Sequence, residues 1–150
     1  MSNRTRLIVT VIIFLVISSQ LALFGYIFHM IDRVKIIDAD IYLTEKTVGF
    51  NLDKDRLHFG SVPRGQVSSY RHITVTNSAD YGLDVILAGR GDLGKWVHFE
   101  LPDGTSTNSF YLGAGEEMDL RVYAYPPSDA QRGKYEGQLI IIFKKHKFFN

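Results

Sequence analysis

Residues 7–30 contain no Lys, Arg, Asp or Glu, and this stretch constrains the chain more than any other feature. A helix of 24 residues is about 36 Å long, which is enough to cross a hydrocarbon core of about 30 Å with some tilt. Fifteen of these residues are Leu, Ile, Val or Phe, whose insertion into a bilayer is favourable. The sequence therefore predicts a membrane anchor over residues 7–31, with apolar contacts to lipid from Leu7, Ile13, Phe14, Leu21, Phe24 and Phe28.

A cleaved signal peptide is the alternative interpretation of this stretch, because the small residues near Ser18 follow a shorter apolar run. Cleavage after Ala22 would place Gln20 where a small residue is needed, and the apolar run then resumes as far as Phe28. These two details favour an uncleaved anchor.

The charges on the two flanks predict the orientation of the anchor. Arg4 and Arg6 precede it without an accompanying acid, whereas residues 32–40 carry charges of both signs. The positive-inside rule then places the N-terminus in the cytoplasm and the following residues outside the cytoplasmic membrane.

The residues after the anchor are nearly neutral and lack cysteine. Without Arg4 and Arg6, the chain has 15 basic and 16 acidic side chains, so it shows no electrostatic signature of nucleic-acid binding. The absence of cysteine excludes a disulfide framework and a thiolate metal site.

Short segments in which apolar and polar residues alternate follow the anchor, and turn residues separate them. This pattern is typical of an all-β domain, and a period of two with one wet face favours antiparallel sheets packed face to face. We expect strands at residues 36–43, 69–77, 83–87, 96–101, 118–124 and 139–143. The predicted boundaries are 1–6 for a cytoplasmic N-terminus, 7–31 for the transmembrane helix, 32–47 for a connector and first strand, 48–144 for a β-sandwich, and 145–150 for a tail.

Three sequence elements resemble one family of β-sandwiches. The segment LHFGSVPRG at 57–65 with ITVTN at 73–77, the turn YLGAGEE at 111–117, and RGKYEGQL at 132–139 are similar to elements of immunoglobulin-like domains of the ASPM, SPD-2 and hydin type, which are related to major-sperm-protein-like domains. Ala114 departs from the pattern, which usually has proline there. The resemblance implies an immunoglobulin-like sandwich over about residues 48–144. An anchor followed by one such domain is also similar to small prokaryotic or archaeal envelope proteins.

The segment GRGDLG at 89–94 matches two short motifs. A dinucleotide-binding G-x-G-x-x-G must open a helix within a βαβ unit, and we predict an interstrand loop here instead. The Arg-Gly-Asp tripeptide makes Arg90 and Asp92 candidate partner-binding residues, because exposed loops carry many binding sites.

Metal-binding and catalytic readings depend on four histidines of the predicted domain. Their spacing fits no compact ligand set, and the strand pattern turns His72 toward solvent. No nucleophile lies in a recognisable elbow. We therefore predict no catalytic, metal-binding or cofactor-binding residues and no cofactor.

The aromatic residues divide into a core set and a surface set. Trp96 and Phe99 are expected in the core, because a large buried ring is the usual centre of a sandwich. Tyr123 has the opposite parity to the apolar residues of its segment, so it should face outward. Tyr123 and Tyr125 are therefore candidate partner-binding residues.

The last residues, KKHKFFN at 144–150, combine lysines with phenylalanines. Such a segment suits anionic lipid or a partner. In an up-and-down sandwich with an odd number of strands, however, the last strand would end far from the membrane. We therefore expect a solvated tail.

Together these features predict a non-catalytic, membrane-anchored module that makes protein contacts in the cell envelope. A first alternative is an accessory or structural subunit of a surface filament or membrane complex, since Ser18, Ser19, Ala22 and Gly25 give the helix a stripe of small residues. A second alternative is an envelope enzyme with a site on loops 89–95 and 102–108.

Overall fold

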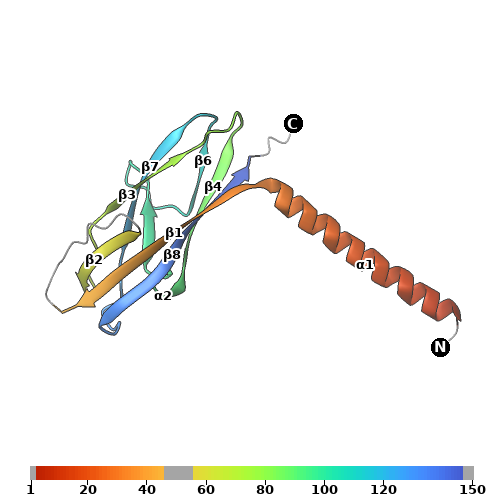
Figure 1. Cartoon of the computed structure of the whole chain (residues 1–150), viewed down its shortest axis with the longest axis horizontal. Helices are drawn as coiled ribbons and strands as arrows, with labels where there is room; N and C mark the ends of the chain where they lie inside the picture. The colour runs from red at the N-terminus through yellow and green to blue at the C-terminus, as the bar shows by residue number, and fades with distance from the viewer. Residues whose placement is uncertain (1–2, 46–55, 147–150) are drawn as a thin grey trace. The chain divides into compact units, whose positions relative to one another are not determined.

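The computed structural model describes residues 3–45 and 56–146. The chain divides into two compact units, Met1–Asp32 and Arg33–Asn150, which are treated separately below. The first unit contains a long helix, and the second is a domain of β-strands (Figure 1).

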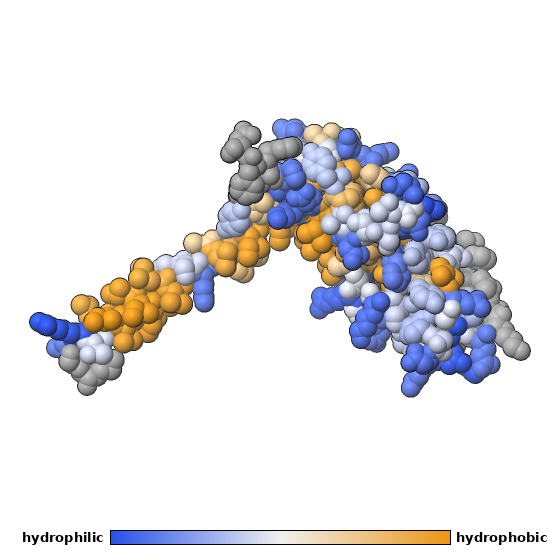
Figure 2. Space-filling view, turned by 180° about the vertical axis from the view of Figure 1, so that it is seen from behind, coloured by the Kyte–Doolittle hydropathy of each residue, from blue (hydrophilic) through white to orange (hydrophobic). Residues whose placement is uncertain are grey.

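Helix α1 (Asn3–Met30) has the length and composition to cross a membrane, although a signal sequence would meet the same criteria. Its exposed apolar side chains form two hydrophobic stretches with a short polar band between them (Figure 2). The hydroxyls of Thr10 and Ser19 donate hydrogen bonds to carbonyls one turn earlier in the helix. These bonds lower the cost of placing a hydroxyl in an apolar environment.

The β-strands of the second unit form two sheets. Sheet A has five strands in the order β2-β1-β8-β4-β6, and sheet B has three in the order β3-β7-β5. The strands are β1 (Ile31–Thr44), β2 (Leu57–Pro63), β3 (Arg71–Thr76), β4 (Leu83–Arg90), β5 (Val97–Glu100), β6 (Ser109–Leu112), β7 (Glu117–Ala124) and β8 (Gly133–Lys145). A single helical turn, α2 (Gly91–Gly94), follows β4.

The buried face of each sheet consists of alternate apolar residues, as the sequence pattern predicts. Leu120 and Val122 of β7 are fully buried, and Val85 of β4 and Ile141 of β8 are buried in the same core. Phe99 is also a core residue, whereas Trp96 is half-buried and packs against the core from its edge.

The predicted strands at 69–77, 83–87, 96–101 and 118–124 correspond to β3, β4, β5 and β7. Strands β1 and β8 are longer than expected, and β2 and β6 were not expected as strands. The fully antiparallel sandwich is wrong at one place, because β1 and β2 pair in parallel. Twelve residues separate Thr44 from Leu57, and a connection of this length can return the chain to the same end of the sheet.

The strand β1 begins directly after α1, so its first residues define what we call the anchor-side end of the β domain. The guanidinium of Arg33 donates a hydrogen bond to the Thr76 carbonyl at the end of β3 and lies 4.3 Å from the ring centroid of Phe143 in β8. Strand β8 therefore ends beside the start of β1 (Figure 1). The up-and-down arrangement with an odd number of strands, on which the expected position of this end depended, is wrong, because the described residues form eight strands and two of them pair in parallel.

Candidate functional site

The outer face of sheet B carries the tyrosine that the sequence predicts to face outward. Leu120, Val122 and Ala124 of β7 point into the core and are fully buried. Tyr123 lies between them in sequence, faces the opposite side of the sheet and is half-buried. The predicted orientation of Tyr123 is thus confirmed.

Neighbouring rings hold Tyr123 in place. The ring of Tyr70 meets it edge-on at a centroid distance of 5.2 Å, and the imidazole of His98 stacks on it at 5.3 Å. His98 is the register partner of Tyr123 across the β5–β7 pair. Tyr125 follows at the end of β7 and is 50% exposed. Two tyrosines and one histidine are therefore in contact on one side of the domain, and Tyr125 follows on the same segment of chain.

An arginine held by an ion pair lies beside this cluster. Arg121 forms an ion pair with Glu100 at 2.7 Å, and its guanidinium lies 5.8 Å from the ring centroid of Tyr70. The pair with Glu100 orients the guanidinium before any partner arrives. We call Tyr70, His98, Arg121, Tyr123 and Tyr125 the aromatic face.

The chemistry of the aromatic face suits protein contacts. Tyrosine offers a large, rigid apolar ring and a polar hydroxyl, and Tyr and Arg are enriched among residues that dominate binding energy. Tyr70 and Tyr123 support each other, which lowers the entropy lost on binding.

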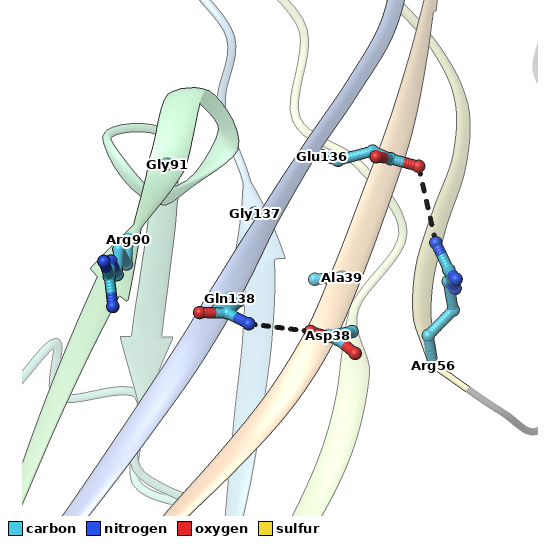
Figure 3. A pocket seen from close by; sticks show the side chains of 8 residues that line it. All are labelled: Asp38, Ala39, Arg56, Arg90, Gly91, Glu136, Gly137 and Gln138. Atoms are coloured by element: carbon cyan, nitrogen blue, oxygen red, sulfur yellow. Dashed lines mark hydrogen bonds and ion pairs between the residues drawn. The ribbon is translucent and has the colours of Figure 1, made fainter.

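A second surface feature is a pocket of about 540 Å³ at the outer side of sheet A (Figure 3). Its lining residues are Asp38, Ala39, Arg56, Arg90, Gly91, Glu136, Gly137 and Gln138. Gln138 donates a hydrogen bond to Asp38 at 3.0 Å, which joins β8 to β1. The side chain of Arg90 is exposed at the end of β4, so it can meet an anionic group of a ligand.

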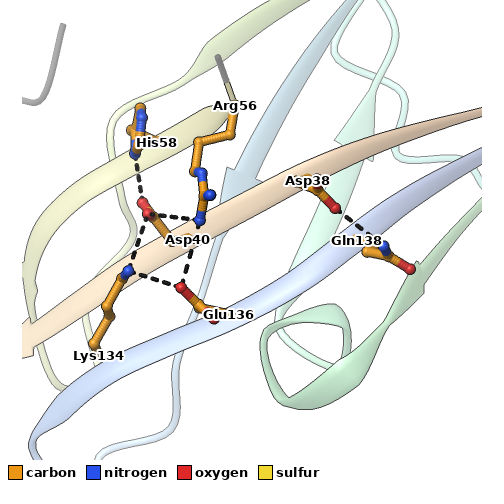
Figure 4. A network of polar contacts seen from close by, with 7 residues as sticks. All are labelled: Asp38, Asp40, Arg56, His58, Lys134, Glu136 and Gln138. Carbon is orange, nitrogen blue, oxygen red and sulfur yellow. Dashed lines mark hydrogen bonds and ion pairs between the residues drawn. The ribbon is translucent and has the colours of Figure 1, made fainter. Parts of the chain in front are cut away.

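The wall of this pocket belongs to a polar network (Figure 4). Asp40 lies 2.6 Å from the imidazole of His58 and 3.9 Å from both Arg56 and Lys134. Glu136 accepts hydrogen bonds from Lys134 at 2.7 Å and Arg56 at 3.4 Å. The hydrogen bond and positive charge of Lys134 lower the pKa of Glu136 below its ordinary value. The network ties β1, β2 and β8 together and keeps opposite charges paired.

The glycines of the segment at 89–94 serve packing. A Cβ on Gly89 would lie 2.3 Å from the carbonyl oxygen of Gly94, so the two backbones can approach only without side chains. The expectation of no helix here is wrong, because α2 forms a single turn. This turn is too short to present a phosphate-binding helix N-terminus of the dinucleotide type.

The structure separates the two pairs of predicted partner-binding residues. Tyr123 and Tyr125 belong to the aromatic face of sheet B, whereas Arg90 and Asp92 lie at the turn between β4 and α2. Arg90 lines the pocket and Asp92 is exposed in the first turn of α2.

The histidines of the described residues lie apart from one another. Within residues 3–45 and 56–146, no group of three His, Cys, Asp or Glu side chains could hold an ion. His58 and His146 each approach a single aspartate, Asp40 and Asp84. His72 is exposed, as predicted from its strand parity.

Sequence reasoning missed Tyr70, His98 and Arg121 as members of the aromatic face. Tyr70 precedes β3, and His98 comes from the short strand β5. Both meet β7 only through long-range strand pairing, for which a single sequence gives no register. In the sequence, only their alternation with apolar residues could have indicated that these side chains face outward.

Comparisons with known proteins give only distant similarities. No family profile matches the sequence, and no curated protein matches it. Among solved structures, the chain is similar to the Burkholderia pseudomallei antigen and type I fimbria protein BPSL1626, with 9% identity, a TM-score of 0.43, and coverage of 75% of this chain and 97% of that one. It is also similar to the DaaE adhesin, with 13% identity, a TM-score of 0.40, and coverage of 73% and 93%. Similarity at this level carries no functional argument.

Proposed function

We propose that this protein is a non-catalytic module of the cell envelope that α1 anchors in the cytoplasmic membrane and that binds another protein through the aromatic face. The proposal places the N-terminus inside and the β domain outside. The observation that carries it is the grouping of Tyr70 and Tyr123 beside Arg121 on the outer face of sheet B, with Tyr125 exposed just past the end of the same strand.

Solvated outer faces of sheets normally carry polar residues. Here the exposed fractions are 47% for Tyr70 and 50% for Tyr125. Burying such rings against a partner would release the water that covers them, and the fixed Arg121 would add a charge-assisted contact.

Two features of the N-terminal unit support the anchor. The uncharged stretch is long enough to span a bilayer, and Arg4 and Arg6 precede it as the positive-inside rule requires of a cytoplasmic flank. The immunoglobulin-like type suggested by the sequence motifs is part of the same proposal.

A role as an accessory subunit of a membrane complex or surface filament is a second candidate. The small residues Ser18, Ala22 and Gly25 recur at helical spacing on α1, and a Cβ on Gly25 would meet no atom within 4 Å. A stripe of this kind permits close approach of another helix. An enzyme has less support, because Asp103 on loop 102–108 accepts a hydrogen bond from the Thr105 backbone, as expected of a structural turn.

Replacing Tyr125 by alanine tests the aromatic face. A photoactivatable cross-linker placed at Tyr70 of the full chain, in native membranes, should give a discrete adduct with a partner. The Tyr125→Ala change should reduce the adduct yield by about 30-fold, as expected for loss of an interface hot spot. Tyr125 makes no ring contact among those found in the described chain, so the melting temperature should stay nearly constant.

Tyr42→Ala is the matched control, because Tyr42 is 52% exposed and lies on β1 of the other sheet. It should leave the adduct yield unchanged. Equal losses from both variants, or no loss from Tyr125→Ala, would contradict the proposal. Tyr123 is a poorer test, since its contacts with Tyr70 and His98 also contribute to stability.

A further inference from the structure

The outer face of sheet A has an aliphatic surface in its anchor-side half. Leu139, Ile141 and Phe143 of β8 point into the core, so Ile140 and Ile142 point outward. Ile86 of β4 is the register partner of Ile142 and is 37% exposed. The outer face of a solvated sheet would carry polar residues at these positions.

The same surface continues onto β1. Val34 and Ile36 are 50% and 56% exposed and share the parity of Asp38, which contacts Gln138 of β8 on the outer face (Figure 4). We call the five residues Val34, Ile36, Ile86, Ile140 and Ile142 the aliphatic patch. Contiguous apolar surface of this kind marks a site of contact with protein or membrane.

Lysine and tyrosine side chains border the aliphatic patch at the anchor-side end. Lys144 follows Ile142 on the outer face of β8 and is exposed. Tyr111 is 48% exposed and packs edge-on against His146 at 4.8 Å, while the ammonium of Lys145 lies 5.8 Å from the ring centroid of Tyr81. Tyrosine and lysine are the side chains that favour the headgroup layer of a bilayer.

Three of the six acidic residues at the anchor-side end lie on the side of sheet B. Glu117 and Asp119 belong to β7, and Glu116 precedes it and accepts a hydrogen bond from the Gly113 backbone. On the sheet A side, Asp84 lies 2.7 Å from the imidazole of His146, and Asp32 is the second residue of β1. The remaining acid of this end is Asp80, in the turn between β3 and β4. Arg33 and Lys35 of β1 have the inward parity of Ala39, and Arg33 contacts Thr76 of sheet B, so they do not belong to the outer face of sheet A. An anionic surface would therefore repel the sheet B side, with three acids, more than the sheet A side, where Lys144 and Lys145 accompany Asp84.

Chain connectivity keeps this end close to the point where α1 leaves the membrane. Arg33 is three residues after Met30, so their Cα atoms are at most about 11 Å apart. Arg33 is already fixed within the β domain through Thr76 and Phe143. No long linker is therefore available to carry the domain away from the lipid surface.

We propose that the aliphatic patch, with Lys144, Lys145 and Tyr111 at its border, rests on anionic lipid headgroups of the bilayer that holds α1. This inference depends on the membrane anchor of the proposed function. Because the two sheets pack face to face, the aromatic face on sheet B then points away from the membrane, toward partners.

The absence of cysteine in the chain permits a direct test with site-directed spin labels on the full-length protein. Labels at Ile36→Cys in the aliphatic patch, at Thr74→Cys on the outer face of sheet B, and at Val16→Cys in the centre of α1 are compared in vesicles of phosphatidylcholine with about a third phosphatidylglycerol. The label at position 36 should collide with a water-soluble nickel chelate at least about threefold less often than the label at position 74. Replacing Lys144 and Lys145 by glutamine, or removing phosphatidylglycerol, should reduce this difference.

Three outcomes would overturn the inference. Equal nickel accessibility at positions 36 and 74, with position 16 shielded in lipid, would refute the lipid contact while leaving the anchor intact. Dipolar broadening between labels at position 36 would assign the aliphatic patch to a second copy of the chain. A water-accessible label at position 16 would instead refute the anchor of the proposed function, and the inference with it.

Discussion

Replacing Leu120 by alanine should lower the free energy of unfolding of the β domain by about 2–5 kcal/mol. Leu120 is completely buried in β7, the central strand of sheet B, where it pairs with Ile73 of β3. The change removes apolar atoms from the core and leaves a cavity that a two-sheet packing closes only in part. Chemical unfolding of the full chain in detergent, followed by the fluorescence of the single tryptophan, Trp96, measures this loss.

Asp119→Ala provides the control for Leu120→Ala. Asp119 is the preceding residue of β7, is exposed, and accepts one hydrogen bond from the Thr74 hydroxyl at 2.6 Å. Its loss should change the free energy of unfolding by less than about 1 kcal/mol. A Leu120→Ala variant as stable as Asp119→Ala would mean that the side of β7 that carries Leu120 does not face the core.

The parity of β7 was predictable because alternation is a local property of the chain. Buried Leu120 and Val122 and outward Tyr123 follow from a period of two, whatever strands lie beside them. The same reasoning placed β3 and β4 within two or three residues of their observed bounds. Length and charge likewise predicted the apolar helix, although its orientation in a membrane remains a prediction.

Pairing between distant strands was not predictable from the same information. The parallel pair of β1 and β2 depends on a long connection rather than on any residue pattern within the strands. The strand β6 has only four residues, and its neighbour is β4 through non-local hydrogen bonds. The direction of β8 can be counted from the strands before it only in an up-and-down arrangement, and the parallel pair of β1 and β2 breaks that arrangement.

The candidate surfaces also depend partly on local alternation and partly on the pairing of distant strands. Tyr123 and Tyr125 were predictable as outward residues, but the stacking of His98 on Tyr123 requires the β5–β7 register. Similarly, the position of Arg90 beside Asp38 in one pocket depends on β1, β8 and β4 lying side by side. Composition gives the chemistry of such surfaces, and tertiary pairing decides which residues share one.

The opposite outer faces of the sandwich have different chemistry, which gives the two proposals a common geometric basis. Sheet A presents aliphatic residues with lysine at their border, and sheet B presents tyrosines around Arg121. In the proposed arrangement, one face directed to lipid leaves the opposite face available for protein. The spin-label and cross-linking experiments test these two faces independently.

Replacing Asn77 by aspartate should destabilise the β domain by about 3 kcal/mol or more. Asn77 is completely buried, and its Nδ2 donates to the carbonyls of Tyr81, Leu112 and Gly113 at 2.8, 3.2 and 2.8 Å. Its Oδ1 accepts a hydrogen bond from the Ala79 backbone at 3.0 Å. One carboxamide thus joins the turn after β3 to the turn after β6.

The aspartate variant keeps the size of the side chain but turns the donor into an oxygen that faces three carbonyl oxygens. Burial and these oxygens should raise the pKa of the introduced carboxyl above its unfolded value. Its protonated form can donate to one carbonyl, so the stability of Asn77→Asp should rise relative to the parent chain as pH falls below about 6. Urea unfolding of both proteins between about pH 5 and 8 measures this difference.

Ser78→Ala is the matched control, since Ser78 is the next residue in the turn and is exposed. It should change the free energy of unfolding by less than about 0.5 kcal/mol at every pH. The stability of Asn77→Ala should lie between those of Asn77→Asp and Ser78→Ala. The alanine leaves the carbonyls of Tyr81 and Gly113 without this donor but introduces no charge. An aspartate variant at least as stable as the alanine variant at pH 8 would show that the carboxamide does not donate to buried carbonyls. The backbone hydrogen bond from Asn77 to the Glu116 carbonyl would then hold the two turns together.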